Sequence, residues 1–112
     1  MSHSPDDYLG HILLETSFIL EVSAGLEYDS FLEDKTLKRA FVRSLEIIGE
    51  ATKKLPDDFR QQHDHISWKQ MAGMRDKLIH EYFGVDYEVV WKVVIDEIPF
   101  LHQQIQAILD RI

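Results

Sequence analysis

The strongest constraint on the fold is a run of apolar residues with helical spacing between Ser30 and Leu55. Apolar or small residues recur there every three or four positions, which places their side chains on one face of an α-helix. Such a face needs other elements to cover it, so the stretch predicts the longest helix of a helical bundle, which we call the central helix. The face consists of Leu37, Ala40, Phe41, Ser44, Leu45, Ile48, Ala51 and Leu55.

The two helices expected before Pro56 carry clear end signals and one unusual glycine. A first helix is expected from Ser4 to Gly25, because a serine followed by Pro5 and two aspartates favours a helix start. Gly49 lies inside the central helix, where glycine costs about 1 kcal/mol relative to alanine. Close approach of a second helix would explain a glycine at this position.

Two further helices are expected after a polar, irregular stretch. A capping box that begins at Ser67 predicts a third helix running to about Phe83, where Gly84 supplies a left-handed stop. Asp86 can cap a fourth helix, whose apolar face continues to the C-terminus. Pro99 interrupts that face, so we expect a kink or a break near Asp96.

The bulk properties of the chain fit one compact helical domain. Its 112 residues predict a single domain, residues 1–112, and no stretch shows the alternation typical of strands. We therefore predict an all-α, up-and-down bundle of four or five helices. The sequence has no cysteine, no signal-peptide pattern and no apolar run of membrane-spanning length, so we expect a cytoplasmic protein that does not contact a membrane.

The net charge limits how the protein can bind nucleic acid. A formal charge of -8 argues against a protein that coats nucleic acid by bulk electrostatics. It leaves room for a concentrated basic patch, and it also suits a protein that docks onto a basic partner.

The stretch from Met74 to Gly84 is the candidate functional site. It brings Arg75, His80 and Tyr82 together within eight residues, close to a glycine that should end a helix. At about 100° per residue, Arg75 and His80 point roughly 140° apart on an ideal helix. They converge only if the arginine bends round, if the helix loosens before Gly84, or if a second copy of the chain supplies the partner.

The residue types in this stretch suit the cleavage of RNA. Asp76 lies one turn below His80, where its carboxylate can orient the imidazole and favour its charged form. A histidine poised near neutral pH can take the proton of a ribose 2′-hydroxyl or give one to the leaving 5′-oxygen. Arg75 can hold the scissile phosphate and stabilise its developing charge. These two groups suffice for catalysis, so we expect no metal ion and no other cofactor.

The same residues also have an ordinary structural interpretation. Arginine and histidine are common near helix ends, where Asp76 can pair with His80 and the helix dipole favours a cation. Tyr82 on its own is typical of a half-buried packing residue. Spacing alone leaves both interpretations open.

The stretch resembles a known protein family. Arg75-x4-His80-x-Tyr82 matches the R-x4-H-x-Y motif of HepT-like toxins, which belong to the HEPN superfamily. Further segments look like that family in the same order, so the resemblance covers almost the whole chain. These segments are residues 44–51, 66–68, 71–75, 80–83 and 89–91.

The resemblance implies a fold, an activity and a partner. The fold would be a HEPN-type bundle that forms homodimers, with the motifs of both protomers lining a composite cleft. The protein would be a metal-independent endoribonuclease, the toxin of a toxin–antitoxin pair, that cleaves mRNA or tRNA with Arg75 and His80. Tyr82 matches the tyrosine that, in this family, an MntA-type nucleotidyltransferase antitoxin modifies with AMP. Such AMP groups would add bulk and negative charge beside His80 and repel RNA phosphates.

A basic stripe on the central helix offers candidate contacts to RNA phosphates. Lys38, Arg39 and Arg43 could bind phosphates if this helix borders the cleft. The structural alternative is a solvated face whose cations pair with nearby glutamates, each pair contributing a few tenths of a kcal/mol.

Two other functions are compatible with the sequence. The chain could be a non-catalytic helical subunit that docks a nucleotidyltransferase, with Tyr82 as the modified residue. It could also bind a nucleotide whose phosphate is held by Arg75 and His80. Growth and RNA integrity after expression of the chain alone would separate the catalytic function from these two.

Overall fold

The computed structural model of the chain describes residues 4–78 and 84–111. The regular elements in these ranges are helices, so the predicted all-α fold class is confirmed. None of the described helices is both long enough and apolar enough to cross a membrane. In chain order the elements are α1 (Pro5–Ser23), α2 (Tyr28–Glu33), α3 (Lys35–Lys53), α4 (Asp57–Gln62), α5 (Trp68–Ala72), α6 (Met74–Leu78), α7 (Tyr87–Lys92), the π-helical turn η1 (Val93–Glu97) and α8 (Ile98–Asp110).

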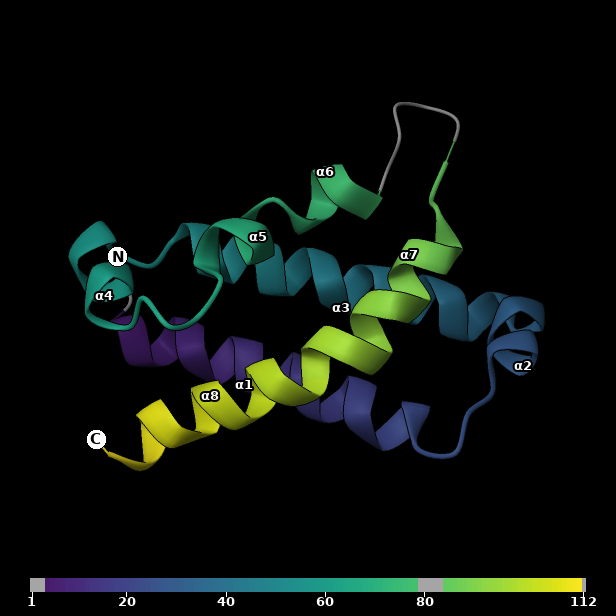
Figure 1. Ribbon diagram of the computed structural model, residues 1–112, viewed down its shortest axis with the longest axis horizontal. Helices are drawn as coiled ribbons and strands as arrows, with labels where there is room; N and C mark the ends of the chain where they lie inside the picture. The colour runs from purple at the N-terminus through teal and green to yellow at the C-terminus, as the bar shows by residue number, and fades with distance from the viewer. Residues whose placement is uncertain (1–3, 79–83, 112) are drawn as a thin grey trace.

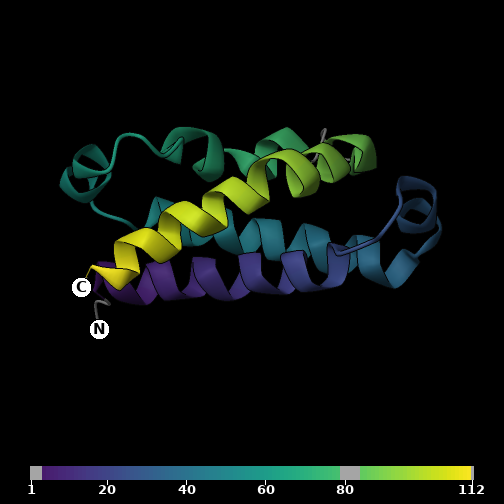
Figure 2. The same cartoon turned by 60° about the horizontal axis from the view of Figure 1, so that its bottom comes forward.

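The helices form two packed layers. α1 and α3 lie side by side and run in opposite directions, joined through α2 at one end of the molecule (Figure 1). α8 lies across α1, and α5 and α6 pack on α3, so these elements cover one face of the α1–α3 pair (Figure 2). α1 begins and α8 ends at the opposite end from α2 (Figures 1 and 2). This arrangement is an all-α bundle in two layers.

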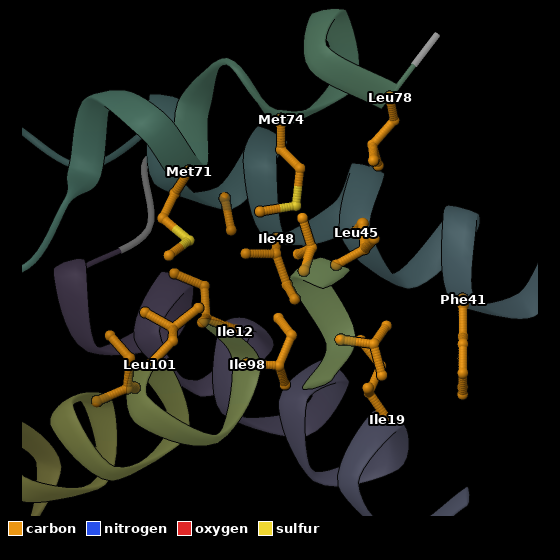
Figure 3. Packing of buried hydrophobic residues seen from close by; sticks show 14 of the residues in the cluster. Ile12, Ile19, Phe41, Leu45, Ile48, Met71, Met74, Leu78, Ile98 and Leu101 are labelled. Carbon is orange, nitrogen blue, oxygen red and sulfur yellow. The ribbon is translucent and has the colours of Figure 1, made fainter. Parts of the chain in front are cut away.

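The core lies between these layers and holds α6 in place. Met74 and Leu78 point from α6 toward Ile48 and Leu45 of α3 (Figure 3). Their side chains are 1% and 0% exposed. Burial of a side chain of this size contributes roughly 1.5–3 kcal/mol. Although α6 has only five residues, its apolar face therefore attaches it firmly to the central helix.

The central helix begins later than the sequence pattern predicts. The stretch expected as one helix from Ser30 to Leu55 is divided at Asp34 into α2 and α3, so the prediction is wrong in this respect. The Asp34 backbone is extended, and its carboxylate accepts a hydrogen bond from the Leu37 N–H at 2.9 Å. Aspartate is a strong cap of this kind. The break also lets α2 turn Phe31 fully into the core.

The third predicted helix is divided as well. The sequence predicts one helix from Ser67 to about Phe83, but α5 ends at Ala72 and α6 begins at Met74. Gly73 separates them with φ −86° and ψ 6°, consistent with the low helix propensity of glycine. The Ser67 side chain makes no capping hydrogen bond, so the predicted capping box is wrong. The predicted continuation to Phe83 lies outside the described residues.

The close approach predicted at Gly49 is confirmed. A Cβ atom at this position would lie 3.2 Å from the carbonyl oxygen of Met71 and 3.7 Å from that of Ala72. The first distance is tighter than ordinary van der Waals contact. A glycine in α3 therefore lets the end of α5 lie directly against the α3 backbone.

The C-terminal helices follow the predicted signals. The Asp86 carboxylate accepts hydrogen bonds from the N–H groups of Glu88 and Val89 at 3.1 and 3.2 Å, which confirms Asp86 as the cap of α7. The interruption expected before Pro99 is the π-helical turn η1, and Pro99 lies in the first turn of α8. Proline cannot donate to the carbonyl one turn earlier, and the wider π turn accommodates this.

Candidate functional site

Arg75 and Asp76 lie on the exposed face of α6. The buried side chains of Met74 and Leu78 bracket them and fix which face of this short helix is turned inward. Residues next to an anchor on a helix point away from the anchored face. Arg75 and Asp76 are accordingly exposed to solvent. α6 therefore presents a guanidinium and a carboxylate from a well-packed backbone.

An ion pair connects the same helix to the C-terminal half of the chain. The Nζ atom of Lys77 lies 3.8 Å from an Oε atom of Glu97 in η1. Both side chains are partly exposed, so the pair contributes about 0–1 kcal/mol. The pair is therefore a minor link between α6 and η1 beside the packing of Met74 and Leu78.

His80 and Tyr82 lie outside the described residues, but the two ends of their segment are placed. We call residues 79–85 the motif segment. The Asp86 N–H donates a hydrogen bond to the Leu78 carbonyl oxygen, with 3.0 Å between the two atoms. Gly84 has a φ of 110°, a conformation that residues with a side chain rarely adopt. Leu78 and Asp86, the residues that flank the motif segment, are therefore held together by a hydrogen bond at the junction of α6 and α7.

The predicted basic residues of α3 lie against different elements. The Nζ atom of Lys38 lies 4.6 Å from the ring centroid of Tyr87, the second residue after the motif segment. Arg39 is exposed. Arg43 lines a groove between α3 and α1. The structure therefore brings Lys38 to the start of α7 and turns Arg43 toward the N-terminal helix.

The described part of the site can bind a phosphate group but lacks a group for proton transfer at neutral pH. Arg75 can donate two parallel hydrogen bonds to phosphate oxygens, whereas an ionised Asp76 can only accept. Among residues 4–78 and 84–111, no group of three or more His, Cys, Asp or Glu side chains is placed to hold a metal ion. His80 is the histidine that follows Arg75 most closely in the chain, and it lies outside the described residues.

Two features of the structure were missed by sequence reasoning. The first is a hydrogen bond of 2.8 Å between the Thr16 hydroxyl, which is fully buried, and His102 Nδ1, which joins α1 to α8. Because 86 residues separate this pair, no local pattern indicates it. The second is the wall of aromatic side chains that Tyr8 and His11 form opposite Arg43. In the sequence, this wall is indicated only by the helical spacing of Tyr8 and His11, and the same spacing is common among residues that simply pack in a core.

Comparison with known proteins identifies the family. The family model described as "Ribonuclease HepT-like" matches residues 12–108. A protein of Caldanaerobacter subterraneus subsp. tengcongensis, named "Putative RNase TTE0752", is 53% identical over 108 residues, or 96% of each chain. "Probable ribonuclease HepT" of Thermococcus cleftensis is 48% identical over 101 residues, or 90% of this chain and 92% of the relative. No solved structure matches. Because the family model spans most of the chain and the fold is a HEPN-type bundle, the chain belongs to the HepT-like ribonuclease family.

Proposed function

We propose that the protein is a metal-independent endoribonuclease in which Arg75 and His80 cleave RNA, and that it is the toxin of a toxin–antitoxin pair. The observation that carries this proposal is the exposed Arg75 on a short helix fixed by Met74 and Leu78. His80 follows Leu78 by two residues, and covalent geometry limits that separation to about 7 Å between Cα atoms. The relatives named as ribonucleases support the same activity.

The proposed reaction is a transfer within the RNA strand. The ribose 2′-oxygen attacks the adjacent phosphorus, the bond from phosphorus to the 5′-oxygen breaks, and a cyclic phosphate and a 5′-hydroxyl are formed. The proton lost by the 2′-oxygen is balanced by the proton gained by the 5′-oxygen, and His80 carries out one of these transfers. Arg75 binds the phosphate and stabilises the charge that develops on it. Asp76 orients His80.

We propose that two protomers form the working enzyme. An arginine and a histidine five positions apart on one helix diverge, whereas a two-fold axis beside α6 would let one protomer supply Arg75 and its partner supply His80. Lys38 then contributes a phosphate contact, because it lies over Tyr87 at the end of the motif segment. Arg39 is exposed on the same helix and is proposed as a further contact.

The proposed control of this enzyme is AMPylation of Tyr82 by a cognate MntA-type nucleotidyltransferase. The phenolic oxygen attacks the α-phosphorus of ATP and releases pyrophosphate. The added phosphate is negatively charged and lies two residues from His80. It would repel RNA phosphates from the cleft.

Expression of the chain alone tests the catalytic proposal. We expect growth arrest and RNA fragments that end in a cyclic phosphate, with both effects absent in His80→Ala. Normal growth and intact RNA with well-folded wild-type protein would instead favour a non-catalytic subunit that docks a nucleotidyltransferase or binds a nucleotide.

Co-expression with the nucleotidyltransferase tests the proposed modification. The wild-type protein should gain adenylyl mass, and Tyr82→Phe should not. An unchanged wild-type mass would contradict the modification.

A further inference from the structure

A groove between α1 and α3 combines an apolar floor, an aromatic wall and two cations. It has a volume of about 320 Å³. Tyr8 and His11 of α1 form one wall, with their rings 6.4 Å apart and nearly perpendicular. Arg43 and Ile47 of α3 lie along the other side, together with Lys54, which caps the C-terminal end of α3. None of these five residues belongs to α6 or to the motif segment.

The cations lie at the two ends of one straight stripe on α3. Arg43 and Lys54 are eleven residues apart, which is close to three full helical turns, so their side chains leave α3 on nearly the same face. Their Cα atoms are separated by about 16 Å along the helix axis. Ile47 and Ala51 occupy the same stripe between them and supply apolar contact surface. This layout offers positive charge at both ends and an apolar surface in the middle.

The groove holds cations in a chain that is strongly acidic overall. The formal net charge of the chain is -8, so a groove that contains two positive side chains differs in charge from the protein as a whole. One carboxylate also lines the groove, that of Glu50, and its Oε1 atom lies 3.6 Å from Lys53 Nζ. Because this pair is exposed, Lys53 neutralises Glu50 only in part.

We propose that this groove binds single-stranded RNA, as a contact site separate from Arg75. Proteins that bind single strands combine a positively charged groove along the backbone with aromatic side chains that stack on bases. Arg43 and Lys54 would each bind a phosphate, and Tyr8 would stack on a base between them, with the ring of His11 supporting it. The proposal deepens the ribonuclease function, because the groove would hold a part of the substrate away from the scissile bond.

The direct test measures binding to an RNA that cannot be cleaved. A fluorescein-labelled, 2′-O-methyl 15-nucleotide single strand lacks the attacking hydroxyl, so anisotropy titrations report binding alone. In Arg43→Gln/Lys54→Gln, the slope of log affinity against log salt should fall by about 1.4, since each single-strand phosphate contact contributes about 0.7. Lys92→Gln is the control, because Lys92 is an exposed, ion-paired cation of α7 outside the groove, and it should leave the slope unchanged.

Two further variants test the other parts of the groove. Glu50→Gln removes the one carboxylate that lines it and should raise RNA affinity about two- to fivefold. Tyr8→Leu should weaken binding about tenfold, whereas Tyr8→Phe should restore it, because stacking needs the ring but not the hydroxyl. Thermal unfolding of each variant shows whether Tyr8→Leu acts through binding or through loss of structure.

The outcomes separate this proposal from its alternatives. The same salt slope and affinity in the double variant as in Lys92→Gln would overturn it. Saturable binding of AMP that is lost in the double variant, with RNA binding unchanged, would overturn it in favour of a mononucleotide pocket. A change of oligomeric state with unchanged RNA binding would assign the groove to a protein interface instead.

The groove and the catalytic proposal can fail independently. Suppose that neither the wild type nor any variant cleaves unmodified RNA, while binding of the 2′-O-methyl strand is weakened in the double variant. The ribonuclease proposal then fails and the groove proposal stands. If RNA is cleaved and the double variant keeps the wild-type KM, the groove proposal fails and the catalytic one stands. The expected result is a raised KM with kcat retained.

Discussion

Arg75 shows how a single residue can be exposed and yet firmly positioned. Its neighbours Met74 and Leu78 are buried, so the backbone that carries the guanidinium is anchored although the side chain itself is free to meet a ligand. An exposed side chain contributes little to stability, so its replacement tests function without unfolding the protein.

Arg75→Lys should reduce kcat for RNA cleavage by roughly 100-fold and leave the melting temperature unchanged. Lysine keeps the positive charge, but it cannot form the two parallel hydrogen bonds that hold a phosphate in one orientation. The measurement is the cleavage rate at saturating RNA together with a thermal melt. A variant with the wild-type rate would show that bidentate binding by Arg75 is not part of catalysis.

Gly49 illustrates the opposite case, a buried position without a side chain. Gly49→Ala should destabilise the protein by about 1–3 kcal/mol, because the new Cβ would meet the Met71 carbonyl oxygen at 3.2 Å, which belongs to backbone and yields little. Denaturant unfolding gives the free energy of the change.

Gly10→Ala is the matched control for this prediction. Gly10 is also inside a long helix, α1, but a Cβ there would have no neighbour within 4 Å. The change should therefore stabilise the protein by about 0.5–1 kcal/mol, the ordinary preference of a helix for alanine. Equal effects of both substitutions would contradict the close approach of α5 to α3.

At the level of elements, the chain uses short helices to hold the motif segment at both ends. α6 is fixed by packing on α3, and α7 is fixed by the Asp86 cap. The hydrogen bond from the Asp86 N–H to the Leu78 carbonyl oxygen joins the two. Two small elements therefore fix the residues that flank the motif segment, Leu78 and Asp86, relative to each other.

Asp86→Ala should destabilise the protein by about 1 kcal/mol and lower the cleavage rate as well. The substitution removes the acceptor of two backbone N–H groups at the start of α7, and it frees the C-terminal end of the motif segment. Asp86→Asn keeps a capping oxygen and should retain most of both properties. Thr16→Val removes the hydrogen bond of 2.8 Å between the buried Thr16 hydroxyl and His102 Nδ1, which joins α1 to α8, and should affect stability alone. Loss of activity in Thr16→Val to the same extent would show that general destabilisation explains the effect.

At the level of the whole molecule, the main prediction concerns the assembly of the site from two copies. If Arg75 and His80 act across a dimer, mixing inactive Arg75→Ala with inactive His80→Ala should restore activity. Each mixed dimer then contains one site with both native residues, and an equal mixture should reach about a quarter of the wild-type rate. The measurement is RNA cleavage after subunit exchange.

Two outcomes would contradict this assembly. No recovery of activity in a mixture that contains mixed dimers would place Arg75 and His80 of one site in the same chain. A strictly monomeric wild-type protein that still cleaves RNA would lead to the same conclusion. Sedimentation across a range of protein concentrations gives the oligomeric state needed to interpret both.

The candidate site is predicted from local signals in the sequence, whereas its surroundings are not. The spacing of Arg75, His80 and Tyr82 and the signals at Gly84 and Asp86 are local, so they can be recognised without a structure. The groove beside Arg43 is different. It depends on how α1 packs against α3, and no pattern within one helix contains that information.

By itself the sequence determined the helical class and the capped start of α7, because periodicity and capping act over a few neighbouring residues. It marked Gly49 as unusual, but the reason for a glycine there is the contact of α3 with the distant α5 backbone. The tertiary structure alone decided that the central helix begins after Asp34, that the third helix divides at Gly73, and that Lys38 and Arg43 face different helices. These features depend on burying side chains such as Phe31 against distant parts of the chain. Contacts of that kind contribute more free energy than the local preferences they override.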